Sequence, residues 1–213
     1  MLELARGGRS GLLVAATGAG KTLAGFLPTI CELIERPAEG LHTLYVSPLK
    51  ALGVDVQRNL LGPIGEMDLP IRVETRSGDT PSDRKARQRV RPPHILLTTP
   101  ESLSLLLSYP DSGTLFAGLK TIVVDELHAF AKEKRGDLLS LSMARLQRFA
   151  PGLRRVGLSA TISDAPTSKL ATIAAENARF RKSAMGRSGQ GTWAWRHTSS
   201  ADRSTPARIR GSA

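Results

Sequence analysis

Two short groups of residues have the composition of a nucleotide-binding site. The first is the stretch AATGAGKT, residues 15–22, which follows the apolar run GLLV and contains Gly18, Gly20, Lys21 and Thr22. Glycines let backbone N–H groups turn toward phosphate oxygens, a lysine reaches the outer phosphates, and a threonine hydroxyl ligates Mg²⁺. A helix starting here adds its N-terminal dipole. The spacing predicts a phosphate-binding loop; a glycine-rich turn with an accidental Lys-Thr is the alternative interpretation.

The second group is VVDELH, residues 123–128, where Asp125 and Glu126 end an apolar run and His128 follows. A carboxylate at the end of such a strand lies beside the phosphate loop in this architecture, where it can hold Mg²⁺. The neighbouring carboxylate can orient and deprotonate an attacking water. Taken alone, the motif is equally compatible with a solvated acidic turn. About a hundred residues after a phosphate loop, it predicts metal-assisted nucleotide hydrolysis.

A single scaffold can position both groups. Apolar runs predict strands at 11–16, 41–46, 71–75, 94–99, 119–125 and 154–161. Helical patterns lie between them at 21–36, 49–61, 81–90, 101–108 and 137–149. Alternating strands and helices with continuously apolar strands predict an α/β fold with a mostly parallel sheet flanked by helices. Ligands of such sheets bind at the carboxyl ends of the strands.

The charge of the chain favours a polyanionic partner. The 213 residues carry a formal net charge of +11 and a pI near 10.6, which indicate nucleic acid before a membrane surface. Residues 1–161 hold 21 Lys and Arg against 16 Asp and Glu, whereas residues 162–213 hold 9 against 3. More than half of the excess therefore lies in the last quarter of the chain, and the pI overstates how basic the folded part is.

One basic cluster leaves two interpretations open. It comprises Arg84, Lys85, Arg87, Arg89 and Arg91. It could be a phosphate-binding stripe or the solvated face of a helix, and charge runs alone discriminate poorly between the two. We favour the solvated face because Asp79 and Asp83 lie beside it.

The single cysteine, Cys31, cannot form an intramolecular disulfide and has no metal-ligand spacing around it. Its helical pattern with Phe26, Leu27, Ile30 and Ile34 predicts a small core hydrophobe, which fits a reducing cytoplasm. No window of about 18 apolar residues exists, so we expect no membrane span.

The composition changes beyond about residue 164. The segment 180–213 has no strand or helix periodicity and is rich in Arg, Ser, Gly and Thr, which is typical of disorder. We therefore expect one domain over 1–164 and a basic, largely disordered tail over 165–213. The abrupt change motivates the hypothesis that a frameshift produced the tail.

Five stretches together resemble a known family. They are AATGAGKT (15–22), VSPLKAL (46–52), TTPESL (98–103), VVDELH (123–128) and LSAT (158–161). In order and spacing they resemble motifs I, Ia, Ib, II and III in the first RecA-like motor domain of superfamily 2 helicases. Longer stretches such as GLHTLYVSPLKALGVDVQRNL are similar to DEXH-box helicases of the large helicase-related (Lhr) family, especially the bacterial ligase-associated DNA-damage-response type. The resemblance covers residues 1 to about 164.

The resemblance implies a RecA-like P-loop domain that uses ATP and Mg²⁺ to drive 3′→5′ translocation on single-stranded DNA, with duplex unwinding. It implies single-stranded DNA or a DNA/RNA hybrid as the partner, DNA-repair ligase or nuclease partners, and a cytoplasmic location without membrane contact.

The family roles carry over by position. Nucleotide binding falls on Thr17, Gly18, Ala19, Gly20, Lys21 and Thr22. Metal binding falls on Thr22 and Asp125, and catalysis on Lys21, Asp125, Glu126 and His128. The nucleic-acid path falls on Pro48, Lys50, Gly78, Thr99, Pro100 and Glu101. Coupling of hydrolysis to the DNA falls on Ser159, Ala160 and Thr161.

Several departures from the family pattern shape the expected activity. Ala15 and Ala16 stand where the family usually has Gly and Pro, a change that removes no ligand. The adenine-recognition segment, the second RecA-like domain with its arginine fingers, and the winged-helix region are not recognisable. We therefore expect an ATP-binding motor fragment with little unwinding of its own. The alternatives are a regulatory module that binds nucleotide and nucleic acid without turnover, and a small-molecule P-loop kinase, for which no acceptor signal is found.

Overall fold

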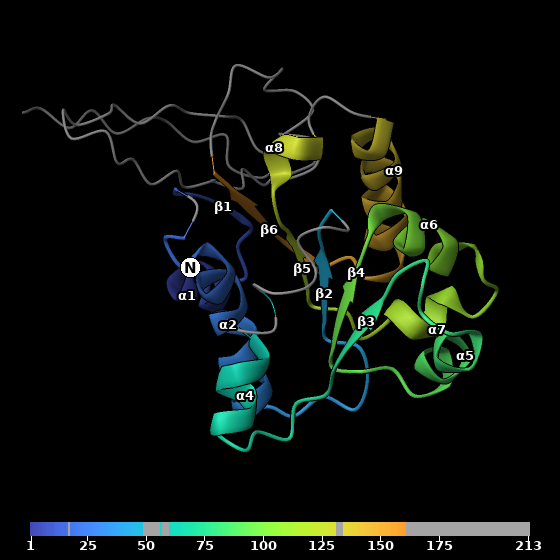
Figure 1. Ribbon diagram of the computed structural model, residues 1–213, viewed down its shortest axis with the longest axis horizontal. Helices are drawn as coiled ribbons and strands as arrows, with labels where there is room; N and C mark the ends of the chain where they lie inside the picture. The colour runs from blue at the N-terminus through green and yellow to red at the C-terminus, as the bar shows by residue number, and fades with distance from the viewer. Residues whose placement is uncertain (17, 49–55, 57–59, 131–133, 161–213) are drawn as a thin grey trace, which may run out of the picture.

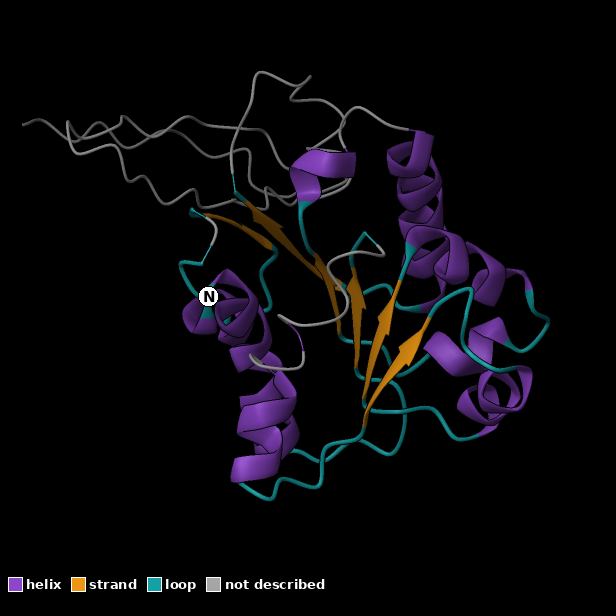
Figure 2. Ribbon diagram, viewed as in Figure 1, coloured by secondary structure: helices purple, strands orange, loops and turns teal. Residues whose placement is uncertain are grey.

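A six-stranded parallel sheet with helices on both faces forms the protein (Figures 1 and 2). The computed structural model describes residues 1–16, 18–48, 56, 60–130 and 134–160. The strands are β1 (Gly11–Val14), β2 (Thr43–Val46), β3 (Val73–Arg76), β4 (Ile95–Thr98), β5 (Thr121–Val124) and β6 (Arg154–Ser159). The helices are α1 (Leu2–Arg6), α2 (Lys21–Glu35), α4 (Gly62–Glu66), α5 (Ser82–Val90), α6 (Pro100–Ser108), α7 (Ser112–Phe116), α8 (Leu127–Phe130) and α9 (Lys134–Phe149).

The strand order is β1-β6-β5-β2-β4-β3, and every pairing is parallel. The predicted α/β fold is confirmed, and all six predicted strands are present. Because parallel strands place their carboxyl ends at one edge, the loops after β1, β5 and β6 share that edge. Figure 1 shows α8 just beyond this edge, directly after β5.

Two apolar cores lie on opposite faces of the sheet. On one face, Phe26, Ile30 and Leu33 of α2 belong to the same buried cluster as Val123 and Leu158 of the strands. The cluster on the other face combines Leu103, Leu106 and Leu107 of α6 with buried residues of α7, α8 and α9. The central strands β2, β4 and β5 are buried along their whole length, which explains their short runs rich in Val, Ile and Leu.

The prediction that Cys31 is a core hydrophobe was wrong. Cys31 is half-buried, and Leu27 and Ile34 are exposed at 39% and 52%. The buried side of α2 instead contains Phe26 and Ile30, both at most 3% exposed. Both stripes of α2 are apolar, so periodicity alone could not decide which one faces the sheet.

The amino edge of the sheet is held by a charged network around Arg154. The guanidinium donates hydrogen bonds to both carboxylate oxygens of Glu32, to the carbonyl of Ala5 at 2.9 Å and to the hydroxyl of Thr121 at 2.7 Å. These partners come from α2, α1 and the start of β5. A largely buried Arg–Glu pair is tolerated when further hydrogen bonds satisfy both groups, so this network fixes α1 and α2 against the strands.

Four of the five predicted helices are confirmed as α2, α5, α6 and α9. Most of the predicted helix 49–61 lies outside the described residues, as do the expected boundary at 164 and the segment 165–213. Within the described part of the chain, no helix combines the length and apolar character needed to cross a membrane.

The basic helix α5 forms specific ion pairs. Arg87 contacts Glu74 of β3 at 2.7 Å, and Arg89 contacts Asp111 at 2.8 Å while lying 4.0 Å from the centre of the Tyr109 ring. The cluster therefore attaches α5 to the sheet edge and to the turn before α7, in addition to facing solvent. The two interpretations of this cluster remain predictions.

Candidate nucleotide site

The loop after β1 has the backbone of a phosphate cradle. Gly18 and Gly20 have φ values of +83° and +73°, a left-handed conformation that residues with a Cβ adopt only at a cost. Lys21 follows at the start of α2 and is 7% exposed. Its Nζ donates hydrogen bonds to the carbonyl oxygens of Ala15 and Ala16, at 2.7 and 2.8 Å. The ammonium group thus lies inside the loop, where a phosphate group would replace the two carbonyls as its acceptor.

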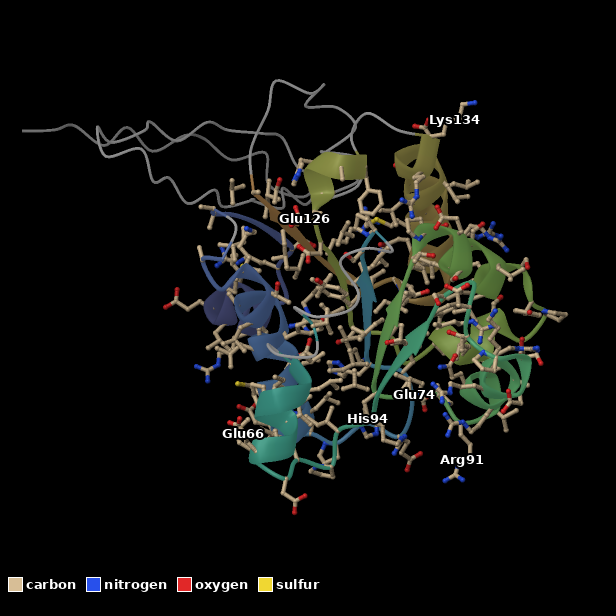
Figure 3. The ribbon with its side chains drawn as sticks, viewed as in Figure 1. Glu66, Glu74, Arg91, His94, Glu126 and Lys134 are labelled. Atoms are coloured by element: carbon tan, nitrogen blue, oxygen red, sulfur yellow. The ribbon has the colours of Figure 1, made fainter. Side chains whose placement is uncertain are left out.

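The acid pair follows β5 at the same edge. Asp125 is buried, and its Oδ1 accepts a hydrogen bond from the backbone N–H of Glu126 at 2.8 Å. Glu126 has a φ of +47°, which is uncommon for a residue with a side chain and costs about 1–2 kcal/mol. The two carboxylates differ in exposure, since Asp125 is buried whereas Glu126 is half-buried. Figure 3 shows Glu126 just below α8, at the opposite edge of the sheet from His94.

Tyr45 connects the acid pair with the phosphate loop, and sequence reasoning missed it. The phenol of Tyr45 donates a hydrogen bond to Oδ2 of Asp125, and the Thr22 side chain lies near enough to the same phenol to influence its pKa. Burial, reinforced by the charge of Asp125, raises the pKa of Tyr45, so the phenol keeps its proton. The parallel register could have indicated the contact, because Tyr45 lies opposite Val123, two residues before Asp125 on the same face.

His128 joins the acid pair to the end of β6. Its Nδ1 lies 3.3 Å from Oε2 of Glu126 and 3.2 Å from Oγ of Ser159. Ser159 is buried and Ala160 is half-buried. Glu126, His128 and Ser159 therefore form a continuous polar chain from the turn after β5, through α8, to the end of β6.

The residues at this edge suit Mg²⁺ shared with phosphates. Asp125 supplies a carboxylate and Thr22 a hydroxyl, and hard cations prefer such oxygen ligands. Among the described residues, no group of three or more His, Cys, Asp or Glu side chains could hold a metal ion by itself. Mg²⁺ is usually bound by one or two carboxylates together with substrate phosphates, and this donor set fits that pattern.

The residues predicted for the nucleic-acid path lie around the ends of β2, β3 and β4. Pro48 is half-buried after β2, and Gly78 is exposed after β3. Thr99 and Pro100 are buried at the start of α6, where the Thr99 hydroxyl accepts a hydrogen bond from the N–H of Ser102 at 3.3 Å. These two residues therefore cap and begin the helix, a structural role compatible with shaping the surface.

Glu101 has a partner that the sequence did not reveal. Arg135 of α9 donates two hydrogen bonds to its carboxylate, at 2.6 and 3.1 Å. Burial alone would raise the pKa of Glu101, but the hydrogen bonds from Arg135, from the backbone and from Thr99, together with the charge of Arg135, outweigh it and lower the pKa. Three further predicted residues, Thr17, Lys50 and Thr161, lie outside the described residues.

The model of the DEAD/DEAH box helicase family matches residues 1–170, a segment that contains both the phosphate loop and the acid pair. The chain belongs to the DEAD/DEAH box helicase family. It is similar to helicases of the Lhr branch. The ATP-dependent helicase Lhr-Core protein 2 of Thermococcus barophilus is 46% identical over 170 residues, which are 73% of this chain and 20% of that protein.

Solved structures agree with this assignment. The helicase Lhr of Mycobacterium smegmatis, bound to single-stranded DNA and AMP-PNP, superposes with a TM-score of 0.68 at 42% identity, over 79% of this chain and 23% of that one. The DUF1998 helicase MrfA, bound to DNA and AMPPNP, superposes with a TM-score of 0.69 at 28% identity, over 81% and 24%.

This helicase chain spans about a fifth of the length of the curated relatives it matches. The matched part corresponds to the ATP-binding domain of Lhr-type helicases, as the motifs predicted, and the RecA-like fold is confirmed. Neither a regulatory module without turnover nor a small-molecule kinase is favoured by these similarities.

Proposed function

We propose that this domain binds ATP with Mg²⁺ and hydrolyses it as the first motor lobe of an Lhr-type DNA helicase. The observation that carries the proposal is that the phosphate loop, with Lys21 buried inside it, and the acid pair, with Asp125 held by Tyr45, follow β1 and β5 at the same edge of the sheet. A similar Lhr helicase has been solved with single-stranded DNA and AMP-PNP, and this likeness supports the choice of ligands.

The phosphate loop binds the triphosphate in this proposal. Backbone N–H groups around Gly18, Ala19 and Gly20 face the phosphate oxygens, and the start of α2 adds its dipole. Lys21 exchanges its two loop carbonyls for the outer phosphates, where its charge offsets the negative charge that develops during phosphoryl transfer. Thr17 would complete the nucleotide contacts.

The acid pair divides two tasks. Asp125 and Thr22 would hold Mg²⁺, which supplies charge neutralisation on the phosphates when it is bound. Glu126 accepts a proton from the attacking water at its carboxylate, and His128 orients that carboxylate through its Nδ1 contact. The two carboxylates have different partners, Tyr45 for Asp125 and His128 for Glu126, which suits two carboxylates with different tasks.

Nucleic acid would bind beside this site, across the loops after β2, β3 and β4. Pro48, Lys50, Gly78, Thr99, Pro100 and Glu101 are the proposed contacts. Backbone and hydroxyl groups suit phosphate contacts without base selection. Single-stranded DNA or a DNA/RNA hybrid is the proposed partner. Ser159, Ala160 and Thr161 would transmit the nucleotide state, since Ser159 contacts His128.

Further parts of the proposal concern the wider protein. We assign residues 1–164 to one RecA-like domain and 165–213 to a separate basic tail. We further propose translocation in the 3′→5′ direction, in which this domain acts as one of two lobes that open and close around ATP. A cytoplasmic role in DNA repair, with ligase or nuclease partners, completes the proposal.

The decisive experiment measures single-turnover ATP hydrolysis by the full chain, with and without single-stranded DNA. Glu126→Gln should bind ATP normally but lose DNA-stimulated hydrolysis, because an amide cannot accept the proton from water. Glu66→Gln is the matched control, since Glu66 lies on α4, well away from Glu126 (Figure 3).

Three results would contradict the proposal. They are the absence of ATP binding to the unaltered chain, ATP binding without any turnover, and turnover by Glu126→Gln at the rate of the unaltered chain.

A further inference from the structure

A tyrosine occupies the centre of the sheet beneath the acid pair. Tyr45 lies on β2, between β4 and β5, and is fully buried. Its ring stacks on Phe26 of α2, with 4.8 Å between ring centroids and 25° between ring planes. Its hydroxyl donates a hydrogen bond to Asp125, with the Thr22 side chain nearby. The tyrosine therefore contacts the phosphate-loop helix with its ring and the proposed metal ligand Asp125 with its hydroxyl.

The sheet itself does not require a hydroxyl at this position. The register partners of Tyr45 are Leu97 on β4 and Val123 on β5, and both are buried apolar residues in the same cluster. A buried phenol without a partner is costly, and an apolar side chain would avoid that cost. Packing in the sheet therefore does not account for the hydroxyl, whereas its hydrogen bond to Asp125 does.

The hydrogen bond from Tyr45 holds the carboxylate oxygen of Asp125 that the neighbouring backbone N–H does not hold. Oδ1 of Asp125 accepts a hydrogen bond from the N–H of Glu126, while Oδ2 accepts one from Tyr45. Two donors at different oxygens fix both the rotation and the plane of the carboxylate. Each oxygen keeps a second lone pair for another partner.

We propose that Tyr45 is a positioning residue for the magnesium site, holding the Asp125 carboxylate in the orientation that a nucleotide-bound Mg²⁺ requires. This inference rests on the proposed function. Groups that orient metal ligands typically contribute 10–100-fold to metal affinity or activity. If the contact were purely structural, Asp125 would serve only as the hydrogen-bond acceptor of a buried phenol. Loss of the Tyr45 hydroxyl would then change nucleotide affinity equally with and without Mg²⁺.

The test compares Tyr45→Phe with the unaltered chain. Phenylalanine keeps the ring on Phe26 and removes only the hydroxyl, so the fold should be retained, as a thermal melt will verify. The second tyrosine of the chain, Tyr109, lies under Arg89 and away from the site, and Tyr109→Phe is the matched control. Binding of fluorescent mant-AMP-PNP is measured in EDTA and across a series of free Mg²⁺ concentrations.

We expect Tyr45→Phe to raise the Mg²⁺ concentration for half-maximal tightening of nucleotide binding by about tenfold or more. Affinity in EDTA should stay within about twofold of the unaltered chain, and Tyr109→Phe should match the unaltered chain throughout.

An unchanged Mg²⁺ midpoint in Tyr45→Phe would overturn the inference. An equal loss of affinity with and without Mg²⁺, or an equal shift in Tyr109→Phe, would overturn it as well, since a structural role predicts those results. Failure of the unaltered chain to bind the nucleotide would overturn the proposed function itself, which separates the two outcomes.

Discussion

The contact between α8 and α9 leads to a sharp prediction about Gly136. This glycine is buried in the first turn of α9, and a Cβ built on it would collide with the carbonyl oxygen of Phe130 and lie 3.0 Å from its carbonyl carbon. Phe130 ends the helix that carries His128. Because the obstructing atoms belong to the backbone, they cannot rotate away, and Gly136→Ala must shift one helix against the other.

The magnitude follows from two opposing effects. Overpacking of a well-packed contact costs about 1–3 kcal/mol, and a backbone collision belongs at the upper end of that range. Alanine recovers about 1 kcal/mol of helix propensity relative to glycine. The expected net loss in the free energy of unfolding is about 2 kcal/mol, or roughly 4–8 °C in melting temperature for a domain of this size.

Urea denaturation followed by circular dichroism measures this change. The matched control is Gly65→Ala in α4, where nothing lies within 4 Å of the added Cβ. The same substitution should stabilise the chain there, by about 0.5–1 kcal/mol. The reasoning is refuted by a Gly136→Ala chain that is as stable as the unaltered chain, or by two substitutions that change stability in the same direction.

Three further predictions concern stability. Burial lowers the pKa of His42 and His94. Near pH 6 the unfolded chain therefore binds more protons than the folded chain, and the stability of the fold should decrease as the pH drops through about 6.5. The melting temperatures at pH 5.5 and 7.5 should differ less for His94→Asn than for the unaltered chain. Glu101→Gln breaks a half-exposed pair with Arg135 and should cost only about 0.2–1 kcal/mol, so a loss of several kcal/mol in urea titration would contradict that estimate. Phe26→Ala removes a fully buried ring and should cost about 3–5 kcal/mol, seen as a lower urea midpoint; an unchanged midpoint would count against the assigned core.

Sequence patterns predicted the strands and the edge of the sheet that bears the site. Short apolar runs mark strands covered on both faces, and parallel strands bring the residues after them together, which is why Lys21 and Asp125 could be assigned to one edge. The short helices α4, α7 and α8 have at most five residues each, too few for a periodic signal.

Other features depend on contacts between distant segments. The pairing of Glu101 with Arg135 joins residues 34 positions apart, and that of Tyr45 with Asp125 joins residues 80 apart. Neither leaves a local pattern. The two apolar stripes of α2 show the same limit, since only the position of the sheet decides that Phe26 is buried and Cys31 is not fully so.

The central claim is that Lys21 and Asp125 serve one nucleotide. A double-mutant cycle on the affinity for mant-AMP-PNP with Mg²⁺, using Lys21→Ala, Asp125→Asn and the double variant, tests it most directly. Residues that share one ligand should show a coupling energy of about 0.5–3 kcal/mol, with the double variant losing less affinity than the two single losses combined. Strict additivity, within about 0.3–0.5 kcal/mol, would mean that the two residues act at independent sites and would contradict the account.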